Sequence, residues 1–169
     1  MELPVQTHQW ASRKPDWAAA AVAGLVAGAV AMVIDLLWTT LVLGANPWHT
    51  AHQVAALLLG QGVLAGDTQA FSLFIVGTAL AIHYVLGMLF GGLVAFIATG
   101  YRYEGSLPML EMIGASLGLL LFLINFYALQ PLFPWVEQMR SGAYLLEHMV
   151  FGMTAALVYG RLARSEKIH

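Results

Sequence analysis

Four long apolar segments dominate the pattern of hydrophobic and polar positions along the chain. They cover residues 17–44, 71–99, 108–130 and 142–163, and each carries few charged residues. A helix needs roughly 20 residues to cross about 30 Å of hydrocarbon, and each segment reaches that length. We therefore expect an all-α protein whose four transmembrane helices form an integral membrane four-helix bundle.

The pattern is duplicated within the chain. Residues 80–88 read LAIHYVLGM and residues 145–153 read LLEHMVFGM, so that Leu, His, Val, Gly and Met recur in register. Such repeats indicate the architecture before any single residue is interpreted. They predict a single transmembrane domain over residues 1–169, built from two parallel helical-hairpin repeats, 17–100 and 108–164.

A second repeated pattern, at an offset of ninety positions, relates the first helices of the two repeats. Two glycines and one polar residue recur there with helical spacing, which places them on one face. Seams of small residues allow helix backbones to approach closely in lipid. The polar residue is then expected to face protein, because a carboxylate that faces lipid costs at least about 2.5–3.5 kcal/mol. These residues are Gly24, Gly28 and Asp35 in the first repeat, and Gly114, Gly118 and Asn125 in the second.

The helices that carry the two histidines also have small residues at helical spacing. His83 and His148 are each followed one turn later by a glycine, Gly87 and Gly152, which leaves a groove beside each ring for another helix or for something flat. Parallel repeats are related by a pseudo-twofold axis along the membrane normal. We therefore expect the two imidazoles to face each other near the middle of the membrane, with Asp35 closer to the outer surface.

The first loop between the predicted helices, residues 44–69, differs from the others. Pro47 can open a short helix there. An apolar stripe in this helix lies opposite two polar residues, which is typical of an amphipathic helix at the membrane interface. The stripe consists of Val54, Leu57 and Leu58, and the polar residues are His52 and Gln53.

Two histidines of this interfacial helix, His49 and His52, are three positions apart. They could share a metal ion, or they could simply face headgroups and water. No third ligand is evident near them in the sequence. Both interpretations therefore stay open.

The distribution of cations predicts the orientation. Positively charged residues favour the cytoplasmic side of a membrane protein. Six cations flank the predicted helices on one side and only Arg140 lies on the other, so we expect both termini in the cytoplasm and the protein in a bacterial inner membrane. The six are Arg13, Lys14, Arg102, Arg161, Arg164 and Lys167.

Composition supports this class and excludes several chemistries. Hydrophobic residues make up 60% of the chain and charged residues 9%, with a mean hydropathy of +0.76. In soluble domains, apolar residues make up about 45–50% and charged residues about 25%. The net charge of −2 and the lack of a basic cluster argue against nucleic acid as a partner. The chain has no cysteine, which excludes disulfides, thiolate zinc sites, iron–sulfur clusters and covalently attached haem. No nucleophile lies at a recognisable spacing from a base, so we do not expect an enzyme.

Three interpretations of the pair His83 and His148 compete. Each imidazole could hydrogen-bond a neighbouring helix and only stabilise the packing. Two opposed histidines could instead be the axial ligands of a b-type haem, which needs no cysteine. In the third interpretation they form a proton or ion relay with Asp35, Asn125 and Glu147, because ionisable groups inside membranes commonly mark such paths.

Glu147 breaks the repeat, because the first repeat has Ile82 at the matching position. The helical spacing turns it about 100° away from His148. It could pair with a partner subunit, or with Arg140 two turns earlier.

Several of these motifs together resemble a known family. NPWH at 46–49 with LLLG at 57–60, IHYVLGMLFGG at 82–92, LINFYALQPLFPW at 123–135 and the helix of His148 resemble a family of small bacterial four-helix membrane proteins that often carry the label sodium:proline symporter. The resemblance covers nearly the whole chain. It implies the four-helix membrane fold and no particular activity.

From the sequence we expect a non-catalytic membrane subunit of a larger bacterial complex, respiratory or electron-transferring, that could hold haem b between His83 and His148. Its partners would be the lipid bilayer and other membrane subunits. The alternative is a small proton-coupled transporter or channel that uses Asp35 and the two intramembrane histidines.

Overall fold

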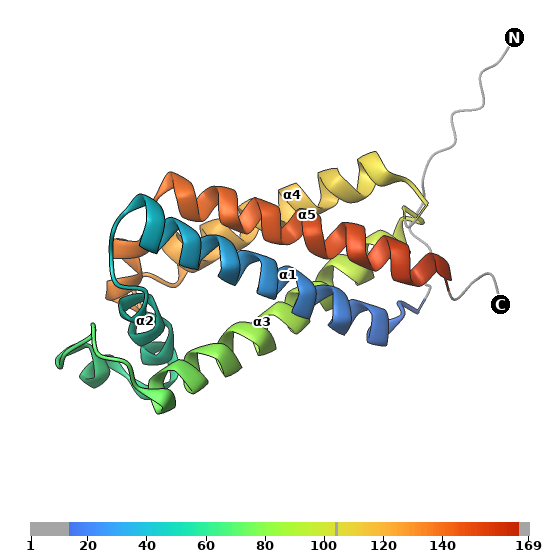
Figure 1. Ribbon diagram of the computed structural model, residues 1–169. Helices are drawn as coiled ribbons and strands as arrows, with labels where there is room; N and C mark the ends of the chain where they lie inside the picture. Colours follow the sequence, from blue (N-terminus) through green and yellow to red (C-terminus); the bar gives the residue numbers. More distant parts are fainter. Residues whose placement is uncertain (1–13, 104, 166–169) are drawn as a thin grey trace, which may run out of the picture.

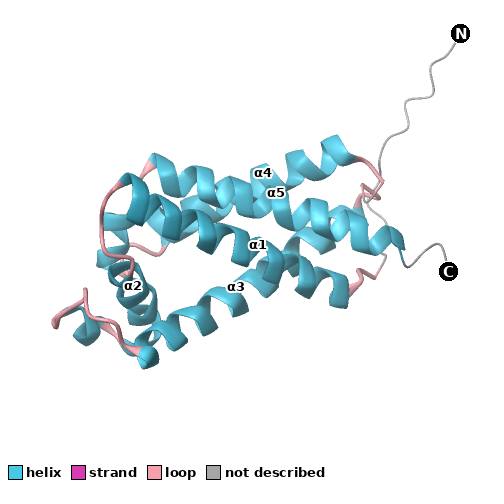
Figure 2. Cartoon of the chain, viewed as in Figure 1, coloured by secondary structure: helices cyan, strands magenta, loops and turns pink. Residues whose placement is uncertain are grey.

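The computed structural model describes residues 14–103 and 105–165, the last two by backbone alone. Helices dominate, and the described residues contain no strand (Figures 1 and 2). The start of α1 and the end of α5 lie at one end of the molecule, and α2 lies at the other (Figure 1). In chain order the elements are α1 (Trp17–Leu37), η1 (Trp38–Val42), α2 (Trp48–Leu59), η2 (Gln61–Leu64), α3 (Leu73–Gly100), α4 (Leu107–Leu123), η3 (Ile124–Ala128), η4 (Pro134–Met139) and α5 (Gly142–Ser165).

Three helical stretches among the described residues are long and apolar enough to cross a membrane. They are Trp17–Val42, Leu73–Gly100 and Leu107–Ala128, which confirms three of the four predicted segments. The fourth, α5, is long enough at 24 residues. It falls short in apolar character because it carries Glu147 and His148 among its residues.

Local sequence signals account for the helix ends. The Asp16 carboxylate accepts a hydrogen bond from the Ala19 N–H at 2.9 Å and caps the start of α1, and Ser72 caps α3 in the same way. Side-chain oxygens at this position satisfy N–H groups that have no partner within the helix. At their other ends, α1 and α4 each continue into a π-helical turn, η1 and η3. Such turns are rare in proteins, and those that occur are often found at functional sites.

Glycines set the contact between α1 and α3. A Cβ atom added to Gly24 would collide with the backbone of Gly87, and one added to Gly91 would collide with the backbone of Ala20. The two helix backbones therefore touch without intervening side chains. Where lipid tails are as apolar as the side chains, association depends on such close packing.

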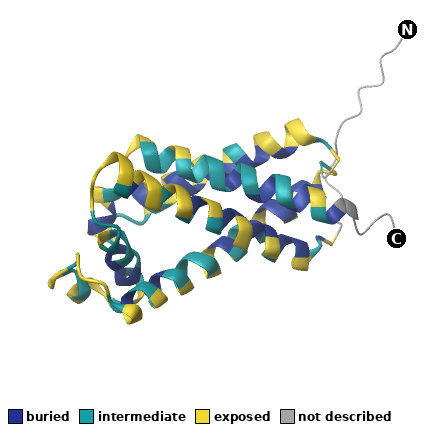
Figure 3. Cartoon of the chain, in the orientation of Figure 1, coloured by how far each residue is buried: buried dark blue, intermediate teal, exposed yellow. Residues whose placement is uncertain are grey.

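The contact between α4 and α5 has the same construction. A Cβ atom on Gly114 would collide with the backbone of Gly152, and one on Gly118 would collide with the backbone of His148. The glycine pattern that recurs in the sequence thus corresponds to the same kind of helix contact in both helix pairs. Figure 3 shows the buried residues on the faces where the helices meet.

Packing between the halves is unequal. α1 packs along α5, whereas α3 and α4 touch only slightly. Alanines such as Ala23 and Ala156 fill the centre. At the end where the helix pairs converge, the buried Tyr159 hydroxyl lies 2.7 Å from the Thr99 hydroxyl and accepts the Asp16 N–H at 3.3 Å. One side chain of α5 therefore joins the start of α1 to the end of α3.

The prediction for the exposed face of α2 is wrong. His52 and Gln53, expected to face headgroups and water, are only 6% and 5% exposed, while Leu58 of the expected apolar stripe is 72% exposed. Of the large apolar residues of α2, Val54, Leu57 and Leu59 are partly buried against the rest of the protein, and its most buried apolar contacts come from small residues. Ala55 packs on α3 and Ala56 on the cluster around Phe126, because small side chains allow close contact on both sides.

Hydrogen bonds hold the His52 ring and the main-chain carbonyl of Gln53 on this face. The His52 Nδ1 donates to the Trp48 carbonyl at 2.9 Å, and the Trp135 indole N–H donates to the Gln53 carbonyl at 3.0 Å. Buried polar groups are costly unless they are hydrogen-bonded. The second bond ties α2 to η4, an element 82 positions away along the chain.

The glycine contacts yield a direct test. We expect Gly24→Ala and Gly114→Ala each to destabilise the protein by about 1–3 kcal/mol, the usual cost of overpacking. Gly77→Ala is the matched control, because a Cβ there meets no atom within 4 Å, and its effect should stay within about 1 kcal/mol. Unfolding in detergent, followed by circular dichroism, measures the difference. Equal stabilities of the three variants would contradict the proposed contacts.

Candidate functional site

Asp35 lies near the end of α1, where it faces α5. Its Oδ1 accepts a hydrogen bond from the Tyr144 hydroxyl at 3.0 Å and one from the Thr39 hydroxyl at 3.4 Å. Thr39 is one turn further along the same helix, and Tyr144 is in the first turn of α5. The carboxylate is therefore directed at protein, as the spacing on α1 predicts, but its partner comes from the other half of the chain.

His148 is held at both ring nitrogens. Its Nδ1 lies 2.7 Å from the Tyr144 carbonyl and its Nε2 lies 3.1 Å from the Asn125 amide nitrogen. A carbonyl can only accept, so Nδ1 carries the proton, and Nε2 accepts from the amide in the neutral ring. Phe122 and Phe126 lie against the imidazole, with ring centroids 5.9 and 5.5 Å away.

His83 makes a different bond. Its Nε2 donates to the Gly28 carbonyl of α1 at 2.8 Å. A Cβ atom on Gly28 would lie only 3.2 Å from this nitrogen, so the glycine makes room for the ring. The matching residues Asp35 and Asn125 therefore have different roles: Asn125 binds the histidine of its own half, whereas Asp35 binds a tyrosine of the other half.

This arrangement bears on the haem interpretation. A pair of axial histidines requires a free nitrogen on each ring facing the iron. Here the Nε2 atoms of His83 and His148 are each hydrogen-bonded within their own half. The glycines Gly87 and Gly152, expected beside a groove, pack on helix backbones. The residues as arranged do not fit an axial pair without breaking these contacts, and haem binding stays a prediction.

Glu147 is the second carboxylate at this end of the molecule. It lies one turn after Tyr144 on α5, close enough for its charge to interact with that of Asp35. No residue in the described ranges donates a hydrogen bond or forms an ion pair with it. His83 likewise lies close enough to interact electrostatically with Asp35 and with His148. Asp35 thus lies within electrostatic range of both Glu147 and His83.

Asp35 and Glu147 are among the residues that line an open groove between α1 and α5. Its volume is about 210 Å³. The surface of the groove is almost entirely hydrocarbon, so the carboxylates and the Tyr144 hydroxyl contribute very little to it. The lining residues are Ile34, Asp35, Trp38, Ala143, Tyr144, Leu146, Glu147 and Val150.

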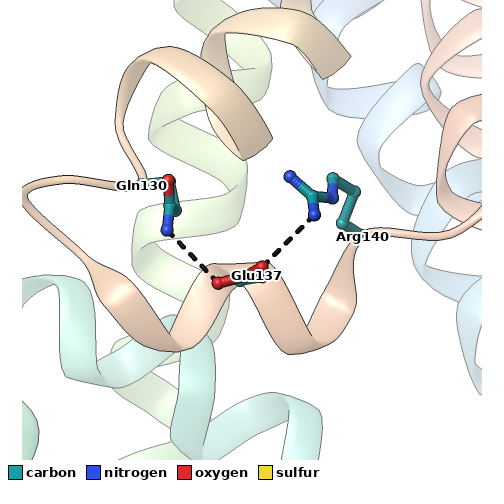
Figure 4. Close-up of polar contacts among 3 residues, drawn as sticks. All are labelled: Gln130, Glu137 and Arg140. Carbon is teal, nitrogen blue, oxygen red and sulfur yellow. Dashed lines mark hydrogen bonds and ion pairs between the residues drawn. The ribbon is translucent and has the colours of Figure 1, made fainter.

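Arg140, considered above as a partner for Glu147, binds elsewhere. Its guanidinium lies 3.3 Å from a Glu137 carboxylate oxygen, and the other oxygen accepts from the Gln130 amide at 3.2 Å (Figure 4). The guanidinium also lies 4.9 Å from the centre of the Tyr127 ring. Of the two alternatives for Glu147, the pair with Arg140 is wrong, because a closer carboxylate in η4 holds the cation, whereas a pair with a partner subunit stays a prediction.

The histidines of α2 are not brought together. His49 is exposed and its Nδ1 lies 2.9 Å from the Thr68 hydroxyl, whereas His52 is buried and bonds the backbone of its own helix. Within the described ranges, no group of three or more histidines and carboxylates is placed to hold a metal ion. A shared metal at this position gains no support from the structure.

Sequence reasoning missed Tyr144. The residue lies four positions before His148, so helical spacing puts both on one face of α5, and that signal was readable. Its contact with Asp35 spans 109 positions and depends on how the two halves dock. In the first repeat the matching position is Ala79, so the duplication gave no hint of a hydroxyl here.

Comparison with family models, with characterised proteins and with solved structures finds no match. The resemblance to small four-helix membrane proteins therefore stays a prediction.

The bond between Tyr144 and Asp35 can be tested on its own. We expect Tyr144→Phe to lower the free energy of unfolding by about 0.6–1.7 kcal/mol, the range for hydrogen bonds between membrane helices. Tyr127→Phe removes a hydroxyl of the same kind from an exposed ring and should leave stability unchanged. Steric-trap or denaturant unfolding in detergent measures both. If Tyr144→Phe leaves the free energy of unfolding unchanged, this hydroxyl does not hold the two helix pairs together.

Proposed function

We propose that this protein is a small proton-coupled membrane carrier in which Asp35 takes up the proton. One observation carries the proposal: Asp35, within an apolar helix, and Glu147, on the neighbouring α5, both line an open groove, and no cation is bound to either among the described residues. Unpaired charges inside a bilayer are costly and commonly mark the paths of protons or substrates. A purely structural role would be served as well by an amide, as Asn125 shows in the other half.

The hydrogen bonds define what each group can do. Asp35 accepts hydrogen bonds from the Tyr144 and Thr39 hydroxyls, and both hydroxyls can turn to accept a hydrogen bond from the protonated carboxyl group. His148 bonds the main-chain carbonyl of Tyr144 and the Asn125 amide, and neither group passes a proton on to Asp35. His83 also bonds a main-chain carbonyl, that of Gly28, but it lies within electrostatic range of Asp35, and we propose that it is the histidine that exchanges protons with this carboxylate.

The orientation of the carrier follows from its cations. Lys14, Arg102 and Arg161 belong to the end where α1 starts and α5 finishes, and Arg140 belongs to the opposite end. Arg13 and Lys167 lie outside the described residues, and the Arg164 side chain is not described. By the positive-inside rule, the first end faces the cytoplasm of a bacterial inner membrane, and Asp35 lies nearer the outer surface. All four long helices then cross the membrane as a bundle of two parallel repeats.

A second proposal keeps the chain as a non-catalytic subunit of a larger membrane complex. The observation in its favour is the same groove, because a partner helix that carries Lys or Arg could supply the missing cation. This proposal requires a larger chain that co-purifies in mild detergent. A clean monomer or homo-oligomer from native membranes would count against it.

Proton coupling can be measured in proteoliposomes. We expect Asp35→Asn to reduce the proton flux that a pH gradient drives across the vesicle membrane about tenfold or more, because the amide cannot bind the proton. Asp67→Asn is the matched control in an exposed loop and should retain full flux. Melting curves for both variants show whether the protein remains folded. Full flux in a folded Asp35→Asn variant would refute the proposed role of this carboxylate.

A further inference from the structure

The groove between α1 and α5 offers a proton no polar route to Asp35. Its surface is almost entirely hydrocarbon, and a charged species enters such surroundings only at a high cost. Asp35 itself is partly buried, and its Oδ1 accepts hydrogen bonds from two hydroxyls, those of Tyr144 and Thr39. A proton that reaches this carboxylate is therefore expected to arrive through the groups that are bonded to it.

Of the two hydroxyls bonded to Asp35, that of Tyr144 leads further. Thr39 is only 7% exposed, and among the described residues its hydroxyl bonds Asp35 alone. The Tyr144 hydroxyl donates to Asp35 Oδ1 at 3.0 Å, and its oxygen is also hydrogen-bonded to the side chain of Thr50 in α2. Because the single proton of Tyr144 is engaged with Asp35, the Thr50 hydroxyl is the donor in the second bond. A row of hydroxyls thus runs from α2 through α5 to the carboxylate on α1.

The middle member of this row is held firmly in place. The Tyr144 ring lies 5.8 Å from the Phe126 ring, between centroids, and packs on the apolar cluster that contains Ala56 of α2 and Trp135. Its main-chain carbonyl accepts the His148 Nδ1–H at 2.7 Å. Hydrogen bonds in such a fixed row polarise one another, which strengthens each of them.

The first member of the row lies close to one surface of the molecule. α2 lies at the end opposite the start of α1 and the end of α5 (Figure 1), which is the outer end in the orientation proposed above. Thr50 is half-buried in the first turn of α2, and His49 before it is exposed. The row therefore begins near the outer water and ends at Asp35.

We propose that Thr50 and Tyr144 form the path by which Asp35 takes up its proton from the outer surface. This inference rests on the proposed carrier function and names the residues that supply its proton. A hydronium ion gives a proton to the Thr50 oxygen while Thr50 passes its own to Tyr144, and Tyr144 passes its own to Asp35. Each O–H bond that breaks is replaced by one on the next oxygen, and the carboxylate becomes neutral. Both hydroxyls then rotate back to their starting positions.

The other ionisable groups that face Asp35 are placed differently. Glu147 of α5 and His83 of α3 lie within electrostatic range of it. Among the described residues neither is hydrogen-bonded to Asp35, and the His83 Nε2 donates to the Gly28 carbonyl instead. The uptake path through Tyr144 is therefore distinct from the exchange with His83.

A pH jump followed by time-resolved infrared spectroscopy tests the inference on the purified full chain in lipid nanodiscs. The C=O band of a protonated carboxyl group that is lost in Asp35→Asn reports the protonation of this residue. We expect Thr50→Val to slow the rise of this band about tenfold or more, because the positioned donor is missing while the shape of the side chain is kept. Thr50→Ser keeps the hydroxyl and should retain the wild-type rate. Thr40→Val is the matched control, because the Thr40 hydroxyl donates to the Leu36 carbonyl of its own helix, and its rate should be unchanged.

Tyr144→Phe breaks the path at its second member and should slow the band as well. Circular dichroism shows that each variant is folded. Equal rates in the wild type and in Thr50→Val would overturn the inference, and so would a Thr50→Ser variant as slow as Thr50→Val, since packing would then explain the effect. A protein without a carboxyl band that depends on Asp35 would overturn it too.

The proposed carrier function fails in a different way. If Asp35 is protonated through Thr50 while proteoliposomes show no proton flux that depends on Asp35, the carrier function is refuted and the path is retained. If that flux is present while Thr50→Val and Tyr144→Phe protonate Asp35 at the wild-type rate, the path is refuted and the carrier function is retained.

Discussion

Close approach of helix backbones at glycine is the constraint on which the rest of the structure depends. In lipid, apolar side chains gain little by leaving one apolar environment for another, so helices associate where their backbones can touch. Gly24 meets Gly87 in the first half and Gly114 meets Gly152 in the second. These contacts fix which face of each helix is turned inward, and with it the position of every polar residue one or two turns away.

The same constraint explains why duplicated sequences have different chemistry. Asn125 is aligned with His148 by the glycine contact of its own half and bonds its ring. Asp35 follows an equivalent glycine seam, but His83 bonds the Gly28 carbonyl. The carboxylate is thereby left for Tyr144 of the other half. The two helix pairs make the same kind of glycine contact but differ in their charged residues, and Asp35 and Glu147 both belong to the lining of one groove.

Much of the architecture was predictable because it follows from local rules. The ends of the long helices agree with the predicted segments within a few residues, since apolar length and capping residues decide them. The glycine faces were readable from their spacing, since a helix has a fixed period. The exposed face of α2 could not be predicted in this way. Its buried side consists of small and polar residues whose partners, such as Trp135, come from distant parts of the chain.

The sequence by itself determined the helices, their apolar character, the glycine faces and the list of ionisable residues within them. Only the tertiary structure decided which of those residues meet. α1 packs along α5 while α3 and α4 diverge, and this unequal docking brings Asp35 to Tyr144 and Glu147 instead of placing it on His83. Helical periodicity specifies a direction around one axis, whereas a contact across 109 positions depends on how two helix pairs dock, which no local pattern records.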